Sequence, residues 1–159
     1  MMLHVIDTTT LSNFALIKRP ELVQIALKGQ GVTTAVVLAE LKVGESLGLI
    51  PACDWSRLPV VQLTPAEDSL YEKLRLVLDD GESSCLAIAM TRQAVLVTDD
   101  RQARRLAGEG EIWISGTIGL LLMLIRDGHL APLKANAMLA EMIAHGYRSP
   151  VNDLLALLE

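Results

Sequence analysis

The sequence predicts an α/β protein in which a central parallel β-sheet of about four to five strands is flanked by helices. Three observations support this class. Short apolar runs typical of buried strands alternate along the chain with segments that carry helical periodicity and capping residues. Such alternation favours a parallel sheet with right-handed crossovers. Acidic residues follow directly after two of the strand-like runs, at the edge where open α/β sheets bind ligands.

Length and composition predict one domain over residues 1–159. The 159 residues are 51% hydrophobic and 21% charged, which is the composition of a compact globule rather than of a disordered chain. The net charge of −5 excludes a protein that coats nucleic acid by bulk positive charge. Aromatic residues make up only 3%, too few for a sheet that stacks successive RNA bases. Any nucleic-acid contact is therefore expected to run through the phosphate backbone.

Cysteine and histidine usage predicts a reduced, cytoplasmic setting. Cys53 and Cys85 stand far apart without a CxxC motif, and the three histidines are scattered, so neither a zinc site nor a disulfide framework is expected. The opening MMLHVIDTTT lacks the basic and then apolar build of a secretion signal. The longest uncharged stretch, 112–125, is shorter than the roughly 20 residues that cross a bilayer, so no membrane association is expected.

The first half of the chain predicts two strands and four helices. The strands are 3–6 and 60–63, and the helices are 11–18, 21–29, 35–47 and 64–78. Thr8 to Thr10 supply the cap of the first helix, and Pro20 ends it. The helix at 35–47 is apolar on nearly every side, which predicts that it is internal. Thr64-Pro65-Ala66-Glu67 provides a cap, a first-turn proline and an acid at the start of the fourth helix.

The second half predicts two further strands between helices. A helix covers the sequence SSCLAIAMT with Glu82 in its first turn, and the clearest buried strand follows at 94–97. That strand passes through Thr98-Asp99-Asp100 into a helix at 101–107. A strand at 112–114 precedes a helix from Gly116 that Gly128 closes. Helices at 132–145 and 151–158 make a helical C-terminal tail from about residue 130.

Carboxylates stand at four places where apolar residues are expected. Asp7 and the Asp99-Asp100 pair end strands, Glu40 interrupts an apolar helix, and Glu82 lies on one helical face with Cys85, Leu86 and Ala89. A lone buried carboxylate costs several kcal/mol unless something neutralises it. Because no histidine or cysteine lies beside these acids, a hard divalent cation such as Mg²⁺ or Mn²⁺ is the expected neutraliser.

Each acid also has a purely structural interpretation. Asp7 can start a helix, Glu82 suits a positive helix end, and Glu40 can pair with Arg57 or Lys42. One of Asp99 and Asp100 is expected to cap the following helix. That helix carries three arginines, interpreted either as ligands of RNA phosphates or as a solvated face: Arg101, Arg104 and Arg105.

In order and spacing, these residues resemble a PIN domain over the whole chain. The resemblance rests on Asp7 after a first strand, Glu40 in an early helix, Glu82 in GESSCLAIA, and Thr98-Asp99-Asp100 after a strand. The closing SGTIGLLLMLIRDGHLAPL and the later HGYRSP resemble an uncharacterised PIN-like subfamily close to VapC-type toxins. The resemblance implies a single PIN-like domain that acts as a metal-dependent endoribonuclease and hydrolyses RNA phosphodiester bonds, as the toxin of a toxin–antitoxin pair.

The resemblance also implies site residues and partners. The catalytic set is Asp7, Glu40, Glu82, Asp99 or Asp100, and Thr98, and the ligands of Mg²⁺ or Mn²⁺ are Asp7, Glu82 and Asp100. Many toxin relatives carry Asp where this chain has Glu82. A Thr-x-Asp spacing selects Asp100 and nearness to the strand end selects Asp99, with Asp100 slightly favoured. The partners implied are RNA and a small antitoxin. The apolar stretches TIGLLLMLI and LLALL are interpreted either as core or as the surface of a homodimer. The alternative is a catalytically weak PIN-like module that binds RNA or a partner.

Overall fold

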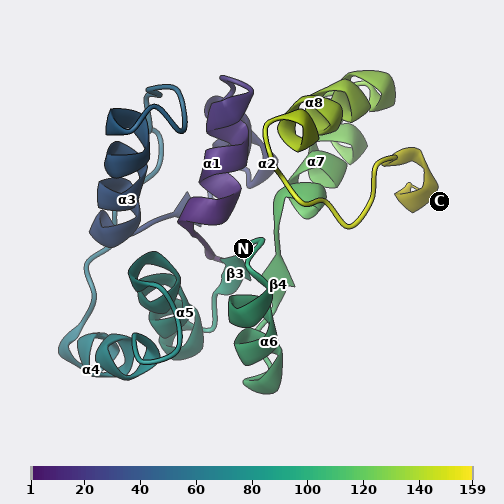
Figure 1. The fold of residues 1–159 in the computed structure, drawn as a ribbon. Helices are drawn as coiled ribbons and strands as arrows, with labels where there is room; N and C mark the ends of the chain where they lie inside the picture. Colours follow the sequence, from purple (N-terminus) through teal and green to yellow (C-terminus); the bar gives the residue numbers. More distant parts are fainter. Residues whose placement is uncertain (1, 159) are drawn as a thin grey trace.

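Four parallel strands form the centre of the molecule (Figure 1). The structure, a computed structural model, describes residues 2–158. The strands are β1 (His4–Ile6), β2 (Gly31–Val32), β3 (Val95–Val97) and β4 (Ile114–Ser115), in the order β2-β1-β3-β4. His4 lies opposite both Gly31 and Val95, and Leu96 lies opposite Ile114. The predicted α/β class with a parallel sheet is confirmed, with four strands.

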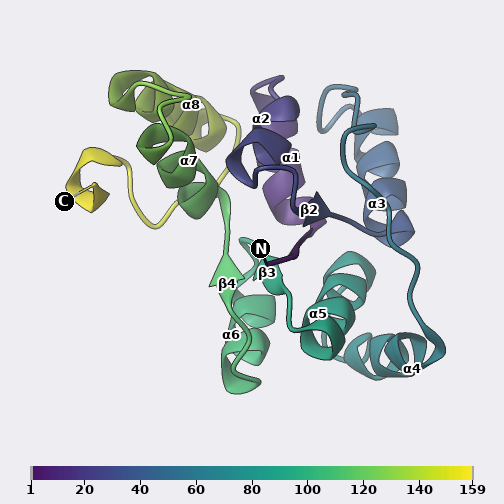
Figure 2. The same ribbon diagram turned by 180° about the vertical axis from the view of Figure 1, so that it is seen from behind.

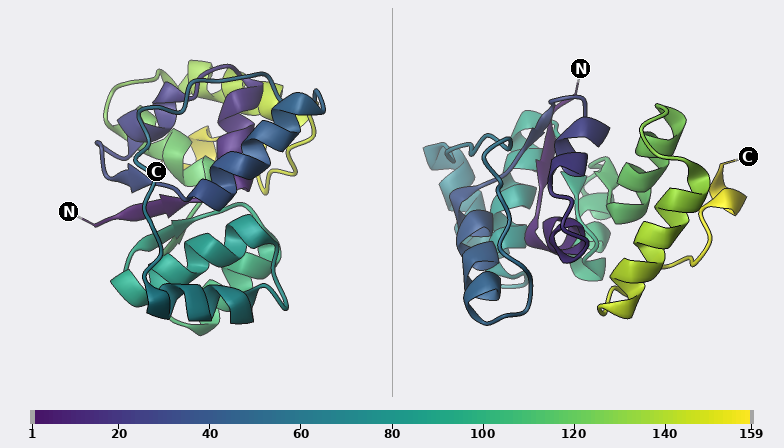
Figure 3. Two further views of the ribbon diagram at one scale, coloured as in Figure 1. Left: turned by 90° about the vertical axis from the view of Figure 1, so that its left-hand side faces the viewer. Right: turned by 90° about the horizontal axis from the view of Figure 1, so that it is seen from above.

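Helices cover both faces of this sheet and make three layers (Figures 1 and 3). One layer contains α1 (Thr8–Leu16), α2 (Glu21–Ala26), α7 (Thr117–Arg126) and α8 (Pro132–Ala144), and the other contains α4 (Pro65–Leu74), α5 (Asp80–Arg92) and α6 (Arg101–Glu109). Helix α3 (Ala35–Ser46) packs against both α1 and α5. Seen from behind, the C-terminal segment lies beyond α7 and α8 (Figure 2). None of the helices within residues 2–158 is long and apolar enough to span a membrane.

The helix starts follow from local capping chemistry. Thr34 caps α3 by accepting a hydrogen bond from Val37 N. Thr64 and Glu67 form a reciprocal capping box at the start of α4, where Pro65 occupies the first turn. Helix α1 begins at Thr8 rather than at Leu11, because the Asp7 carboxylate accepts a hydrogen bond from Thr9 N and caps the helix. Helix α5 likewise begins earlier than predicted, at Asp80.

The core lies between the central strands and the helices on either side. Val5 and Ile6 of β1 and all three residues of β3 are buried, which explains why these positions are apolar. The largest fully buried side chains include Phe14 of α1, Ile88 of α5 and Leu120 of α7. Since neighbouring parallel strands end at the same edge, the residues that follow β1, β3 and β4 are brought together there.

The predicted strand at 60–63 is not formed. It contributes only an isolated bridge between Val60 and Thr33. Strand β2 is only two residues long, so it offers no ladder along which a further strand could extend. Strand β2 itself was not predicted, because two residues are too short to show a period of two. Strand β4 lies slightly later than the predicted 112–114.

Two predictions about helices are also wrong. Helix α3 is not internal: only Val37 and Leu41 are fully buried, and Val43 is exposed, because the helix packs by a single stripe against α1 and α5. The predicted helix at 151–158 is reduced to a 3-10 turn, η1 (Leu155–Leu157). There Leu154 is fully buried and its N–H donates to Asn136 Oδ1 of α8, which anchors the segment to another element.

Candidate functional site

Carboxylates and hydroxyls gather at the carboxyl ends of β1 and β3. Asp7 follows β1, Thr98 follows β3, Asp100 caps α6, and Glu82 lies in the first turn of α5. Glu40 reaches the same region from α3. A cavity of about 450 Å³ opens here between α1, α3 and α5. It is lined by Thr8, Thr9, Val36, Ala39, Glu40, Val43, Asp79, Asp80 and Glu82.

Asp7 is fully buried and held by hydroxyls rather than by a basic side chain. Its Oδ1 accepts hydrogen bonds from Thr9 N at 3.0 Å and Thr9 Oγ1 at 2.6 Å, and its Oδ2 accepts from Thr98 Oγ1 at 2.5 Å. Burial raises the pKa of Asp7 to about 7, against the opposing effect of these hydrogen bonds and with a further increase from the charge of Asp99. Asp7 therefore both caps α1 and presents an electrostatically costly carboxylate.

Glu82 is only 8% exposed and lies among other acids. Burial raises its pKa to about 8, and the negative charges of Asp100, Asp7 and Asp79 raise it further. Within residues 2–158, no lysine, arginine or histidine forms an ion pair with Asp7, Glu82 or Asp100. The electrostatics of this cluster therefore favour any cation that can enter it.

Glu40 is half-buried, and its carboxylate bridges two elements. Oε1 accepts a hydrogen bond from Thr8 Oγ1 at 2.5 Å, and Oε2 accepts from Gly81 N at 3.2 Å. The alternative pairing with Arg57 or Lys42 is not found in the described part of the chain. Neither Thr8, expected only as part of a helix cap, nor Gly81 was predicted as a site residue, although Gly81 stands directly before Glu82 in the GESSCLAIA stretch.

The two candidates for the fourth acid have different surroundings. Asp99 accepts hydrogen bonds from four side chains and one backbone N–H, supplied by Thr10, Asn13, Thr117 and Tyr147. These partners tie the carboxylate to α1, α7 and the C-terminal segment. Asp100 uses Oδ2 to cap α6, accepting from Ala103 N at 2.8 Å, while its Oδ1 accepts no hydrogen bond within residues 2–158. Of these two aspartates, Asp100 is therefore the better candidate to bind a ligand through a carboxylate oxygen.

The acids fit a hard divalent cation by their chemistry. All are oxygen donors, and hydroxyls of Thr8, Thr9 and Thr98 lie among them, which is the donor set that such ions take. In the present side-chain arrangement, no three His, Cys, Asp or Glu residues within 2–158 form a group that could hold one metal ion. The residue types therefore fit the cation, whereas their side chains do not converge on one point.

The three arginines of α6 do not share one role. Arg104 donates from Nη1 to Thr98 O at 2.8 Å and to Ser115 O at 3.1 Å, and so ties α6 to the ends of β3 and β4. Arg105 forms an exposed ion pair with Glu109 on its own helix. Arg101 lines a second cavity, beside Arg104, at the carboxyl end of β4.

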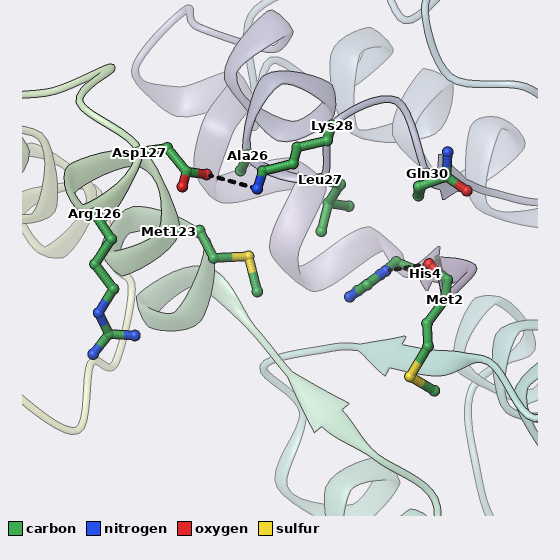
Figure 4. Close-up of a pocket in the computed structure, with 9 residues that line it drawn as sticks. All are labelled: Met2, His4, Ala26, Leu27, Lys28, Gln30, Met123, Arg126 and Asp127. Carbon is green, nitrogen blue, oxygen red and sulfur yellow. Dashed lines mark hydrogen bonds and ion pairs between the residues drawn. The ribbon is translucent and has the colours of Figure 1, made fainter.

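A third cavity lies at the opposite end of the sheet, where β1 begins (Figure 4). It measures about 360 Å³ and is lined by apolar side chains such as Leu27 and Met123, by His4, and by an ion pair between Lys28 and Asp127. None of the predicted site residues lines it. The acids and the hydroxyls that hold them are all at the other edge of the sheet.

A family model described as a PIN domain matches residues 3–158. No curated protein and no solved structure matches the chain. PIN domains are generally nucleases and typically use divalent metals, so the fold is of the nuclease type. The family match covers nearly the whole chain, and this protein belongs to the PIN domain family.

Proposed function

We propose that the protein is a divalent-metal-dependent endoribonuclease that hydrolyses RNA phosphodiester bonds. The observation that carries this proposal is the pair of buried carboxylates, Asp7 and Glu82, whose pKa values are raised to about 7 and about 8 without a basic partner. Acids held at such a cost are typical of functional sites. Membership of the PIN family supplies the reaction class.

Asp7, Glu82 and Asp100 are the residues that would hold the cation. Asp100 keeps one oxygen without an internal partner, and the Asp7 carboxylate is fixed in position by Thr9 and Thr98. When bound, Mg²⁺ or Mn²⁺ would lower the pKa of water and offset the charge of the phosphate oxygens. Thr98 acts as a positioning residue, because its hydroxyl donates to Asp7 and also accepts from Asp100 N.

Glu40 is assigned to the attacking water. Thr8 and Gly81 each donate one hydrogen bond to a different oxygen of the carboxylate, which fixes its orientation at the acid-lined cavity. Each oxygen keeps a lone pair that can accept a hydrogen bond from water. Glu40 would thus turn the water towards the phosphorus atom, a contribution through orientation.

The test is cleavage of RNA by the purified protein. Single-stranded and structured RNAs are incubated with Mg²⁺, Mn²⁺ or excess EDTA, with Asp7→Asn as the matched variant. Cleavage is expected with either metal, none with EDTA, and a loss of at least about 100-fold for the variant. Cleavage that continues in EDTA would contradict the metal requirement.

A second candidate function is an RNA-binding or partner-binding module with little catalytic power. The observation that favours it is the side-chain arrangement, in which no three acids converge within residues 2–158. The same assay separates the two: RNA that is bound but not cut, in the presence of metal, would select the binding module.

We further propose that the nuclease is the toxin of a toxin–antitoxin pair, because the closing stretch resembles an uncharacterised PIN-like subfamily close to VapC-type toxins. Induced expression of the parent is then expected to arrest growth, whereas Asp7→Asn is not. A small DNA-binding partner is expected in the adjacent reading frame. A parent that cuts RNA in vitro without slowing growth would remove the toxin role and leave the nuclease.

A further inference from the structure

A basic cavity lies beside the acids, at the carboxyl end of β4. It measures about 510 Å³ and is enclosed by α6, the start of α7 and the segment 147–150. Its lining is Asp99, Arg101, Arg104, Ile114, Ser115, Gly116, Ile118, Gly119, Tyr147, Arg148, Ser149 and Pro150. The sequence analysis had singled out arginines on the helix following Asp100 but neither Arg148 nor the cavity.

The charges of this cavity are unusual for an acidic protein. Three arginines line it against a single carboxylate, Asp99, whose oxygens already accept five hydrogen bonds from neighbouring residues. Arg104 is fixed by two backbone carbonyls. The side chains of Arg101 and Arg148 form no hydrogen bond or ion pair within residues 2–158, and both residues are exposed. Two guanidinium groups are therefore free to take an anion.

Asp99 and Arg104 both pack closely against Gly116. A Cβ at this position would lie 2.5 Å from Asp99 Oδ1 and 3.0 Å from Arg104 Nη1. The Asp99 carboxylate also accepts from Thr117 N, at the start of α7. Asp99 and Arg104, which lie between the acids and the basic cavity, are thus each fixed in place by hydrogen bonds.

The remaining lining suits the rest of a nucleotide. Ile114, Ile118 and Pro150 offer apolar surface, and Ser149 and Tyr147 offer hydroxyls. The volume lies within the range of roughly 300 to 1,000 Å³ that is typical of small-ligand sites. Arginine is the side chain that recognises phosphate by two parallel hydrogen bonds.

We infer that this cavity binds a phosphate group of RNA between Arg101, Arg104 and Arg148, with the attached nucleoside against Ile118 and Pro150. The inference rests on the proposed function for its choice of RNA. Strands β1 and β4 are two strand spacings apart, about 10 Å. The phosphate held here therefore belongs to a nucleotide near the bond that is cut, and the cavity positions the RNA across the edge of the sheet.

The test is RNA binding by fluorescence anisotropy in EDTA, where a metal-dependent nuclease leaves the RNA intact. Arg101→Ala and Arg148→Ala are each expected to weaken binding about tenfold, the effect of losing one charge-assisted hydrogen bond. The slope of log K against log salt should fall by about 0.7 for each phosphate no longer held. Arg105→Ala is the matched control, since Arg105 lies on the same helix but outside the cavity.

The outcomes separate the alternatives. Equal weakening by all three variants would assign the effect to general charge and overturn the proposed phosphate site. Unchanged RNA binding by Arg101→Ala and Arg148→Ala would also overturn it. Comparison of 5′-phosphorylated, 5′-hydroxyl and circular forms of one RNA distinguishes the source of the phosphate: a terminal phosphate makes only the first form sensitive to the variants, and an internal diester makes all three sensitive. If the parent cuts no RNA but the variants still differ from the control, the cavity stands and the nuclease proposal fails.

Discussion

The carboxylate of Glu40 occupies the space in which a side chain on Gly81 would lie. Gly81 N donates to Glu40 Oε2 at 3.2 Å, and a Cβ on residue 81 would be 2.0 Å from Oε1. The glycine before Glu82 thus makes room for the side chain of a residue 41 positions earlier in the chain. It lets α3 deliver an acid to the start of α5.

Replacement of Gly81 by alanine is expected to displace Glu40 and reduce RNA cleavage by about 10-fold to 100-fold. The free energy of unfolding should fall by only about 1 kcal/mol. Two hydrogen bonds of about 1 kcal/mol each are lost, and alanine gains roughly 1 kcal/mol over glycine in a helix. Gly108→Ala in α6 is the control, as nothing lies within 4 Å of its Cβ position. Full activity in Gly81→Ala would show that the placement of Glu40 does not matter.

The two neighbouring aspartates are expected to respond in opposite ways to replacement by asparagine. In Asp99→Asn, either orientation of the amide points its NH₂ group at an N–H donor, Thr117 N or Asn13 Nδ2, so the variant should lose about 2 to 4 kcal/mol of unfolding free energy. Asp100→Asn keeps the cap of α6, because asparagine caps as well as aspartate. It should fold normally and lose cleavage. Urea denaturation and cleavage rates, measured on both variants, check the assignment; the reverse pattern would make Asp99 the fourth acid.

An ion pair between the buried Glu67 and the exposed Arg92 predicts the acid stability of the fold. Glu67 is 2% exposed and pairs with Arg92 at 2.8 Å. The hydrogen bonds from Arg92, together with those from Thr91 and Thr64, lower the pKa of Glu67 from 4.5 to about 2. A lowered pKa means that the stabilisation is complete above about pH 4.5 and is lost as the pH falls towards 2.

Glu67→Gln is therefore expected to be less stable than the parent by on the order of 2 to 3 kcal/mol at neutral pH, with the gap closing between about pH 4.5 and 2. Thermal melting over this range checks the trend. Glu109→Gln removes an exposed pair with Arg105 and should change little at any pH. A gap that stayed constant down to pH 2 would mean that the carboxylate of Glu67 is not the source of the effect.

The fold class could be predicted from the sequence because its signals are local. Strand β3 is an uninterrupted apolar run, and the start of α4 carries a complete cap at Thr64. Elements defined by contacts between distant segments were not predicted correctly. The burial of α3 depends on which face meets α1 and α5, and an apolar sequence on nearly every side cannot reveal that face.

The candidate site shows the same division. Asp7, Glu82 and Asp100 could be selected because acids after strands or at helix starts stand out in a chain that is 51% hydrophobic. Their hydroxyl partners could not, since threonine is common at helix starts and the bond from Thr98 to Asp7 spans 91 positions. Arg148 was missed for a similar reason: only the folded C-terminal segment brings it to the arginines of α6.

The role of Asp7 as a metal ligand can be tested through stability, because its two interpretations predict different responses to Mg²⁺. Its raised pKa means that the ionised carboxylate destabilises the metal-free fold increasingly as the pH rises from about 3.8 to about 7. Asp7→Asn removes that charge and keeps the cap of α1. At pH 8 in EDTA, the variant should melt at the same or a higher temperature than the parent.

Mg²⁺ at roughly 10 to 100 times its dissociation constant should stabilise the parent by about 1 to 3 kcal/mol, and should stabilise Asp7→Asn by clearly less. Asp68→Asn, at an exposed position in α4, should keep the shift of the parent. Equal shifts in all three proteins would remove Asp7 from the metal site, and with it the main support for a metal-dependent nuclease.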